Sequence, residues 1–313
     1  MQVNLAEAIA LLKLGKVVAI PTETVYGLAA DARNEDALRE IYAIKERPAD
    51  NPLIIHIGSS EQVLDWAATF SPLAQKLANA FWPGPLTLVL PAQSNVSMIV
   101  RAGEPTVALR VPAHPIAQAL LQETGLGLAA PSANKYTQLS PTTAKHVADG
   151  LGEHVPVLDG GACLVGIEST IVAVDGDEWR LLRLGMIAEA DIQMVAGLHA
   201  SNAQTILPKA PGQHVLHYSP TTPLALFSSR AALIEAAATE TNCAALLLGE
   251  GQINNINTFN VPNHPAGMAE KLYDTLHQMD ALKVRKLLIE SPPISPEWLA
   301  IHDRLSRASY KTQ

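Results

Sequence analysis

Residues 17–28 read VVAIPTETVYGL, and this stretch decides how the chain starts to fold. Its first part, residues 17–20, is a short β-branched run, which predicts a strand that ends at Pro21. The loop that follows presents two threonines, a glutamate and a tyrosine before Gly27. Because α/β proteins often bind small ligands in loops at strand ends, we expect this loop to form part of a binding site.

Helical and strand patterns alternate through the first two thirds of the chain. Amphipathic periodicity predicts helices over residues 4–15, 35–44, 71–81 and 141–149. Apolar or β-branched runs predict strands over residues 17–20, 53–57, 86–90, 106–111, 127–130, 155–158 and 170–174. This alternation predicts an α/β fold, in which helices cover a twisted mixed sheet.

A composition change near residue 189 separates this part from the rest of the chain. From about residue 200 the sequence lacks periodicity and is rich in proline, which is typical of a linker, and we expect it to act as a lid. Strands are then predicted over residues 224–227, 244–248 and 286–290, and helices over residues 229–239, 266–279 and 296–308. We therefore predict a large domain over residues 1–188, a linker or lid over 189–223, and a small, open, Rossmann-like α/β domain over 224–313.

The composition is typical of a soluble globular protein, with 48% hydrophobic and 17% charged residues. We expect no membrane span and no signal peptide, since charged residues interrupt the apolar segments. The net charge is −8, and residues 1–188 carry 13 Lys and Arg against 19 Asp and Glu, which disfavours autonomous nucleic-acid binding. Cys163 and Cys243 lack metal-ligand spacing, so we expect a reduced, cytoplasmic protein without zinc.

Two cations, Lys45 and Arg47, stand at the end of a predicted helix, before a turn at Asn51 and Pro52. Cations beside a rigid turn could bind phosphates. They could equally complement the dipole at the C-terminal end of the helix, and the segment alone favours this second interpretation. His56 follows within an apolar run, where a hydrogen-bonded core histidine is the more common case.

Arg110 lies on a largely apolar predicted strand, in the stretch TVALRVP of residues 106–112. By strand alternation it shares one face with Thr106 and Ala108. Burial of an unpaired guanidinium costs several kcal/mol, so Arg110 must find an anion. A structural salt bridge and a ligand carboxylate are both compatible with this pattern.

Two further strands are followed or preceded by polar side chains. APSAN at residues 130–134 repeats the layout of PTET, with Ser132 and Asn134 after a strand and a proline. An ordinary turn, with a helix N-cap at Ser140, would also explain it. GIESTIV at residues 166–172 is followed by Arg183. The alternatives to a binding site here are that Ser169 and Thr170 belong to an edge strand and that Arg183 is a surface cation.

Taken in order, these motifs resemble the YrdC-like threonylcarbamoyl-adenylate synthases over roughly residues 4–188. The segment QHVLHYSP, residues 213–220, and the small C-terminal domain are similar to the two-domain branch of that family. Two positions depart from the usual pattern: Leu184 precedes Gly185 where proline is common, and Ser219 follows Tyr218 where alanine is common. Both departures concern loop shape and remove no functional side chain.

The resemblance implies an enzyme that joins L-threonine, bicarbonate and ATP into threonylcarbamoyl-AMP with release of pyrophosphate. A separate tRNA threonylcarbamoyltransferase complex would then use the product to modify tRNA. By resemblance, the residues around threonine would be Thr24, His56, Arg110, Ala130 and Ser169. Those around ATP would be Lys45, Arg47, Asn51, Thr106, Ser132, Ser140, Arg183 and Tyr218, of which Lys45, Arg47 and Arg183 would act in catalysis. Mg²⁺ would arrive with ATP, since the sequence shows no all-protein metal site.

Two other functions are compatible with such a domain. Carbamoyl adenylation in hydrogenase maturation uses a similar domain, but with zinc-finger and acylphosphatase-like modules that this chain lacks. An RNA-binding module is the other alternative. The acidic balance weighs against it, although a basic cavity could still bind RNA, so direct tRNA binding stays open.

Overall fold

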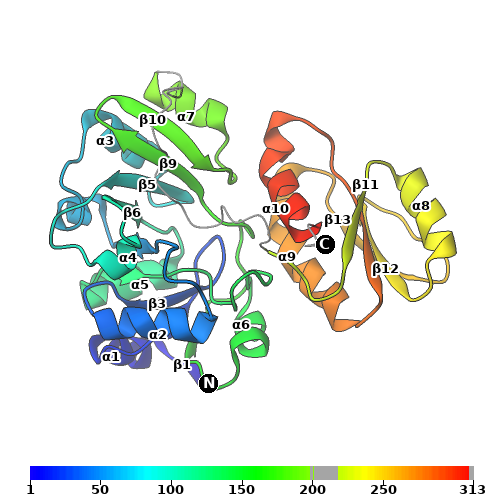
Figure 1. Cartoon of the computed structure of the whole chain (residues 1–313), viewed down its shortest axis with the longest axis horizontal. Coiled ribbons are helices and arrows are strands. Elements are labelled where there is room, and N and C mark those ends of the chain that lie inside the picture. The colour runs from blue at the N-terminus through cyan, green and yellow to red at the C-terminus, as the bar shows by residue number, and fades with distance from the viewer. Residues whose placement is uncertain (198–199, 201–217, 310–313) are drawn as a thin grey trace.

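The computed structural model describes residues 1–197, 200 and 218–309 of the chain. A large domain, coloured blue to green in Figure 1, contains a ten-stranded sheet, and a small domain, coloured yellow to red, contains a four-stranded sheet. The large sheet has both parallel and antiparallel strand pairs. The prediction of a mixed α/β sheet followed by a second α/β domain is therefore confirmed.

The strand order of the large sheet is β1-β8-β2-β3-β7-β4-β6-β5-β9-β10. Its strands are β1 (Gln2–Val3), β2 (Val18–Ile20), β3 (Gly27–Asp31), β4 (Ile54–His56), β5 (Leu86–Pro91), β6 (Thr106–Arg110), β7 (Leu128–Ala129), β8 (Val157–Leu158), β9 (Thr170–Asp175) and β10 (Glu178–Arg183). Neighbouring strands come from distant parts of the sequence, so the sheet brings several strand-end loops together.

The helices of the large domain cover both faces of this sheet. They are α1 (Leu5–Lys13), α2 (Glu35–Lys45), α3 (Pro72–Phe81), α4 (Met98–Arg101), α5 (Pro115–Thr124), α6 (Ala144–Leu151), α7 (Glu189–Ala196) and the 3₁₀ helix η1 (Ser60–Asp65). Alternation along β2 shows the two faces: Val18 and Ile20 pack with α1 and α5, whereas Ala19 packs into the core with α2 and α3. Burial on both faces explains why this run is continuously apolar.

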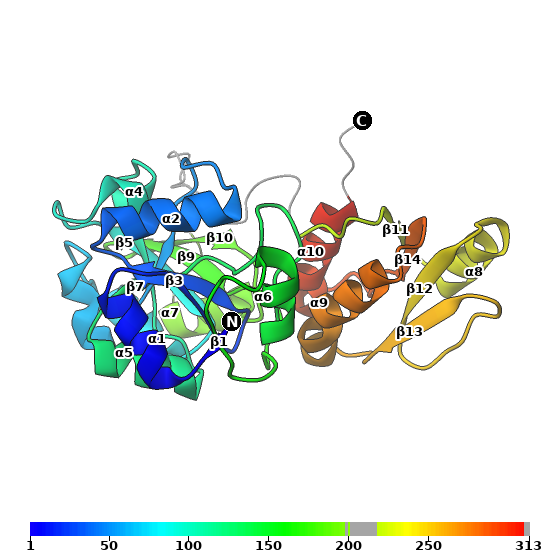
Figure 2. The same ribbon diagram turned by 90° about the horizontal axis from the view of Figure 1, so that it is seen from below.

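The small domain has a parallel sheet of order β11-β14-β12-β13. Its elements are β11 (Leu224–Phe227), α8 (Arg230–Thr239), β12 (Cys243–Leu248), β13 (Asn257–Val261), α9 (Pro265–Ala281), β14 (Lys286–Glu290), the 3₁₀ helix η2 (Pro296–Trp298) and α10 (Leu299–Ser309). In Figures 1 and 2, α9 and α10 lie on the side that faces the large domain, and α8 lies on the other side.

The two domains are in direct contact. The rings of His146 on α6 and His277 on α9 stack with their centroids 4.0 Å apart. His277 Nε2 lies 3.1 Å from the carbonyl oxygen of Ser140. One apolar cluster combines Val25 and Ile167 of the large domain with side chains of α9 and α10. The small domain therefore packs against the end of the large sheet that carries the strand-end loops.

Several elements differ from the sequence prediction. The helix predicted over 141–149 begins three residues later, because Thr143, and not Ser140, caps its N-terminus. The predicted linker begins with α7, which packs against α3. Strands β1, β3, β10 and β13, helices α4 and α5 and the 3₁₀ helix η1 were not predicted. The part of the predicted lid at residues 198–199 and 201–217 lies outside the described residues.

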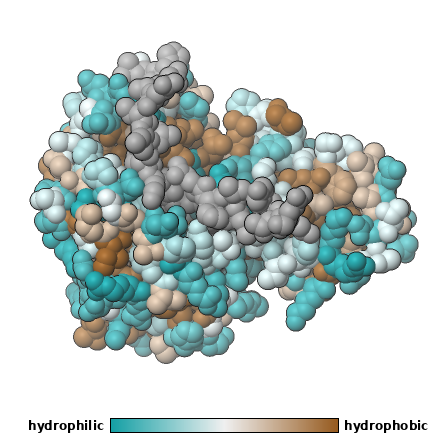
Figure 3. Space-filling view, in the orientation of Figure 1, coloured by the Kyte–Doolittle hydropathy of each residue, from teal (hydrophilic) through white to brown (hydrophobic). Residues whose placement is uncertain are grey.

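The face of the molecule in Figure 3 mixes hydrophilic residues with separate hydrophobic patches. Among residues 1–197 and 218–309, none of the helices has both the length and the apolar character needed to cross a membrane.

Gly166 allows a close backbone approach between the domains. Its φ is +79°, and a Cβ added there would lie 2.2 Å from the carbonyl oxygen of Ala269 on α9. We expect Gly166→Ala to lower the free energy of unfolding by about 2 kcal/mol or more, because α9 would have to shift. Gly161 has a similar φ of +81° but nothing near its added Cβ, so Gly161→Ala is the matched control. If urea denaturation gave equal losses of unfolding free energy for Gly166→Ala and Gly161→Ala, the contact with α9 would not be the cause.

Candidate functional site

One cavity in the large domain collects most of the side chains singled out from the sequence. It lies where the β2–β3 loop and the end of α2 meet β4, β6 and the segments next to β7 and β9. The five residues expected around threonine all line it: Thr24, His56, Arg110, Ala130 and Ser169. Four residues expected around ATP line it too: Arg47, Ser132, Arg183 and Tyr218.

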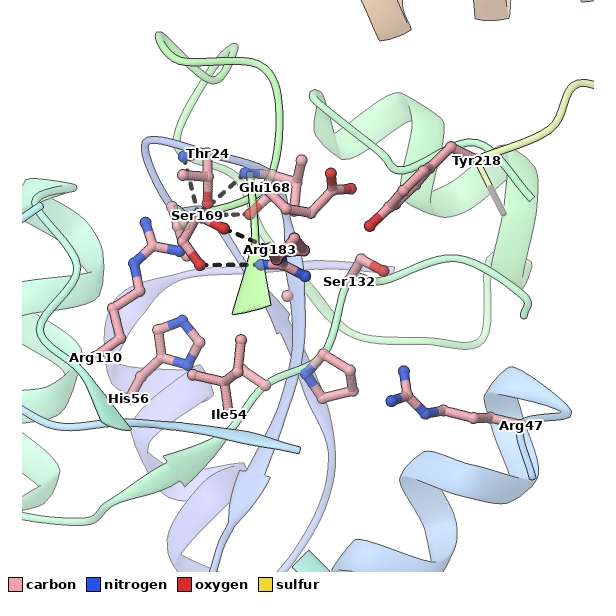
Figure 4. A pocket seen from close by; sticks show the side chains of 15 residues that line it. Thr24, Arg47, Ile54, His56, Arg110, Ser132, Glu168, Ser169, Arg183 and Tyr218 are labelled. Carbon is pink, nitrogen blue, oxygen red and sulfur yellow. Dashed lines mark hydrogen bonds between the residues drawn. The ribbon is translucent and has the colours of Figure 1, made fainter. Parts of the chain in front are cut away.

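The cavity has two chemically different sides. Figure 4 shows Arg110 and His56 on one side and Arg47 and Tyr218 on the other, with Arg183 between them. Parallel pairing of β4 with β6 places His56 directly beside Arg110. The lining therefore offers partners for a small polar group on one side and for an anionic group on the other.

Arg110 is buried and makes three hydrogen bonds. Its Nη2 lies 2.6 Å from Glu23 Oε1, its Nη1 donates to Thr24 Oγ1 at 2.9 Å, and its Nε donates to the carbonyl oxygen of Gly84 at 3.1 Å. The salt bridge considered as an alternative to a ligand carboxylate is therefore present. It occurs at the cavity wall, and a guanidinium with five N–H groups retains two for a ligand.

Glu23 is 7% exposed and stays ionised beside this cation. Burial alone would raise its pKa, but the charge and hydrogen bond of Arg110 outweigh burial and lower the pKa. Its second oxygen, Oε2, is buried and has no hydrogen-bond partner among the described residues. The sequence places Glu23 in the PTET motif, but the pairing with Arg110 was not predicted.

His56 is buried in the cavity wall in its neutral form. Burial, and then the charge of Arg110, lower its pKa to about 3. Its Nδ1 has no hydrogen-bond partner among the described residues. His56 is therefore not the fully hydrogen-bonded core histidine that the sequence alone favoured. A neutral ring nitrogen in a cavity can exchange a hydrogen bond with a ligand hydroxyl or amine.

Arg183 comes from β10, where a register shift after Leu181 redirects the chain. Bulges of this kind often aim a side chain at a functional site. Arg183 donates from Nε to the Ser169 carbonyl oxygen and from Nη2 to Ser169 Oγ, both at 3.0 Å. Ser169 Oγ also lies 2.8 Å from Thr87 Oγ1. The alternative of a surface cation is wrong, because Arg183 is only 8% exposed.

Arg47 and Lys45 lie at the end of α2 but differ in position. Arg47 lines the cavity, where its Nη2 donates to the carbonyl oxygen of Pro52 at 3.1 Å. Lys45 instead lies beneath the loop after β7, and its Nζ donates to the Ser132 and Asn134 carbonyl oxygens at 2.5 and 2.6 Å. Burial, and then the charge of Arg47, hold the pKa of Lys45 well below its usual range. In this structure Lys45 shapes the loop that presents Ser132.

The lining of the cavity does not include four other residues expected around ATP: Lys45, Asn51, Thr106 and Ser140. Thr106 begins β6, at the opposite end of that strand from Arg110. Asn51 is half-buried in the turn before β4. Ser140 is buried and donates to Glu168 Oε1 at 2.5 Å. Their contacts with ATP stay predictions.

The sequence reasoning missed Glu168, which lines the cavity from the GIEST motif. Burial alone would raise the pKa of Glu168, but the charges of Arg304 and Arg183 outweigh burial and lower the pKa below its usual value, so the carboxylate is ionised. The charge partner Arg304 is on α10 of the small domain, with its Nε 2.8 Å from Glu168 Oε2. The position of Glu168 within GIEST was a usable signal, whereas no motif marks Arg304.

No group of three or more His, Cys, Asp or Glu side chains within the described ranges could hold a metal ion. Burial raises the pKa of the Cys163 thiol to about 12, so it is no thiolate nucleophile. The cavity offers cations, hydroxyls, a neutral imidazole and one carboxylate, Glu168, which is paired with Arg304. This set can orient and neutralise an anionic ligand.

Two protein-family models match the chain in succession. The first, described as telomere recombination, matches residues 10–185. The second, described as the C-terminal domain of threonylcarbamoyl-AMP synthase, matches residues 186–309. The two matches meet at residues 185 and 186, three residues before the predicted linker.

Curated relatives and solved structures agree with these matches. The threonylcarbamoyl-AMP synthase of Bacillus subtilis is 40% identical over 321 residues, covering 98% of this chain and 93% of the relative. That of Pyrococcus abyssi is 38% identical, covering 94% and 91%. The crystal structure of P. abyssi Sua5 complexed with L-threonine superposes with a TM-score of 0.90 at 35% identity, covering 99% and 97%.

The neutral, buried His56 predicts how stability depends on pH. Below about pH 6.5 the unfolded chain binds a proton at this histidine, but the folded chain does not until about pH 3. The free energy of unfolding therefore falls as pH falls through this range. We expect the melting temperature to drop less between pH 7 and 5 in His56→Gln than in the wild type. His154→Gln, at an exposed histidine, is the control. An unchanged drop in His56→Gln would show that His56 is not buried as a neutral ring.

Proposed function

The chain belongs to the YrdC-like threonylcarbamoyl-AMP synthase family, and we propose from this premise that it joins L-threonine, bicarbonate and ATP into threonylcarbamoyl-AMP and pyrophosphate. One observation supports the proposal most strongly. All five residues expected around threonine line a single cavity, together with two buried arginines suited to phosphates, Arg47 and Arg183. An RNA-binding module would not require a neutral histidine and a paired arginine on one side of such a cavity.

We propose that threonine binds at the side of Arg110 and His56. The two free N–H groups of Arg110 suit the threonine carboxylate, and Glu23 holds the guanidinium in orientation from behind. Thr24 and the free Nδ1 of His56 lie where they can contact the side-chain hydroxyl or the amine. Positions of this kind would distinguish threonine from an amino acid without a hydroxyl group.

The reaction needs no protein nucleophile. The threonine nitrogen attacks the carbon of bicarbonate, water leaves, and a carbamate forms. A carbamate oxygen then attacks the α-phosphorus of ATP, the bond from this phosphorus to the bridging oxygen breaks, and pyrophosphate leaves. The protein contributes orientation and neutralisation of the charge on the phosphates, which we assign to Arg47 and Arg183.

We propose that Tyr218 covers the nucleotide. It is 1% exposed and lines the cavity on the side of Arg47. The cavity volume is about 50 Å³, which has room for a few water molecules and not for a nucleotide. Part of the lining must therefore move for ATP to enter, and we assign this movement to Tyr218 as a lid residue.

Mg²⁺ is proposed to enter with ATP, bound to its phosphates, because the described residues offer no acidic cluster for it. We also propose that the reaction takes place in the cytoplasm, where the two free cysteines stay reduced. A tRNA threonylcarbamoyltransferase complex would take up the product.

The proposed reaction predicts pyrophosphate release from ATP that requires both co-substrates. Omission of threonine, or of bicarbonate, should each reduce release to background. We expect Arg110→Lys to weaken threonine binding by about tenfold or more, because the lysine keeps the charge but loses the fork that also holds Glu23 and Thr24.

Binding of the unreactive analogue α,β-methylene-ATP is the control for that variant and should change little. Release that is independent of threonine would contradict the proposed function. Equal weakening of threonine and nucleotide binding in Arg110→Lys would contradict the assigned role of Arg110 alone.

A further inference from the structure

The small domain reaches the wall of the cavity through one buried cluster. Arg304 on α10 is 1% exposed, and its Nε lies 2.8 Å from Glu168 Oε2. Tyr273 on α9 donates its hydroxyl to the same oxygen at 3.1 Å. Ser140 donates to the other oxygen at 2.5 Å. With these donors the Glu168 carboxylate is fully engaged, so it acts as an anchor for the small domain and not as a base.

Arg304 also contacts Tyr218, the residue that closes the cavity. Its guanidinium carbon lies 5.0 Å from the centroid of the Tyr218 ring, within the range of a cation–π contact. Its Nη1 pairs with Asp303 at 2.8 Å, whereas its Nη2 is buried without a hydrogen-bond partner among the described residues. Tyr273 adds a tilted ring contact with Tyr218 at a centroid distance of 5.9 Å.

The backbone of Tyr218 needs support of this kind. Its φ is +59°, in the left-handed region that a bulky residue rarely adopts. A residue persists in such a conformation when its surroundings over-determine it. The contacts from Arg304 and Tyr273 hold the ring, and Gly166 lets α9 approach closely enough to provide them.

We propose that the small domain positions the nucleotide side of the active site, with Arg304 as the positioning residue that holds Glu168 and Tyr218 in place. Arg304 does not line the cavity, so it acts through these two residues and touches no substrate. The threonine side, at Arg110 and His56, has its own contacts within the large domain. The inference rests on the proposed function, since it assigns Tyr218 to the nucleotide.

The test measures binding of α,β-methylene-ATP and of L-threonine by calorimetry. Arg304→Lys keeps the charge but cannot bind Glu168 and stack on Tyr218 at once. We expect this variant to bind the analogue about tenfold more weakly and threonine less than about twofold more weakly. Tyr273→Phe, which removes only a hydroxyl, should shift analogue binding in the same direction by about threefold.

Arg230→Lys is the matched control. Arg230 pairs with a glutamate too, Glu290 at 2.8 Å, but this pair lies within the small domain, and Arg230 is at the start of α8, on the side away from the large domain. It should bind both ligands as the wild type does. A purely structural role for Arg304 would lower the melting temperature and leave analogue binding by the folded protein unchanged.

The outcomes separate the two proposals. Wild-type analogue affinity in folded Arg304→Lys overturns the positioning role and leaves the proposed function intact. If Arg304→Lys does not fold, unchanged analogue affinity in Tyr273→Phe overturns it instead. A wild-type chain that binds threonine but not the analogue overturns the proposed function, and the positioning role with it.

Discussion

The excess of buried positive charge is the constraint on which the rest of this structure depends. In the described ranges, five Lys and Arg side chains are buried against two Glu side chains, and all seven lie in or next to one cavity. Two of the cations pair with these glutamates, as Arg110–Glu23 and Arg304–Glu168. A buried charge costs several kcal/mol unless it is well paired and hydrogen-bonded, and two of the other cations, Arg47 and Arg183, line the cavity, where a polyanionic ligand would add to their partners.

This charge distribution also explains the arrangement of the two domains. Glu168 belongs to the large domain, yet the cation that neutralises it comes from α10 of the small domain. Separation of the domains would break this ion pair and leave Glu168 with Ser140, and Arg304 with Asp303, as remaining partners. The same arginine lies over the ring of Tyr218, so one side chain links an interdomain ion pair to a residue that lines the cavity.

Sequence patterns predicted the elements whose signal is local. The run before Pro21 became β2, and PTET, APSAN and GIEST do meet at one cavity. Helix α5 carried a readable signal, with Pro115 in its first turn, but was missed. Strand β3, rich in glycine and alanine, has weak β-propensity. The Glu168–Arg304 pair joins positions 136 residues apart, and the local periodicity of a sequence carries no information about such a distant contact.

The central claim is that the buried cations bind the phosphates of the nucleotide. Calorimetric titration of the wild type with α,β-methylene-ATP and with adenosine tests it most directly. The account predicts that the phosphates supply most of the affinity, so that adenosine binds at least about a hundredfold more weakly. Arg47→Ala should remove much of that difference without changing adenosine binding. Equal affinities for adenosine and the analogue would contradict the account.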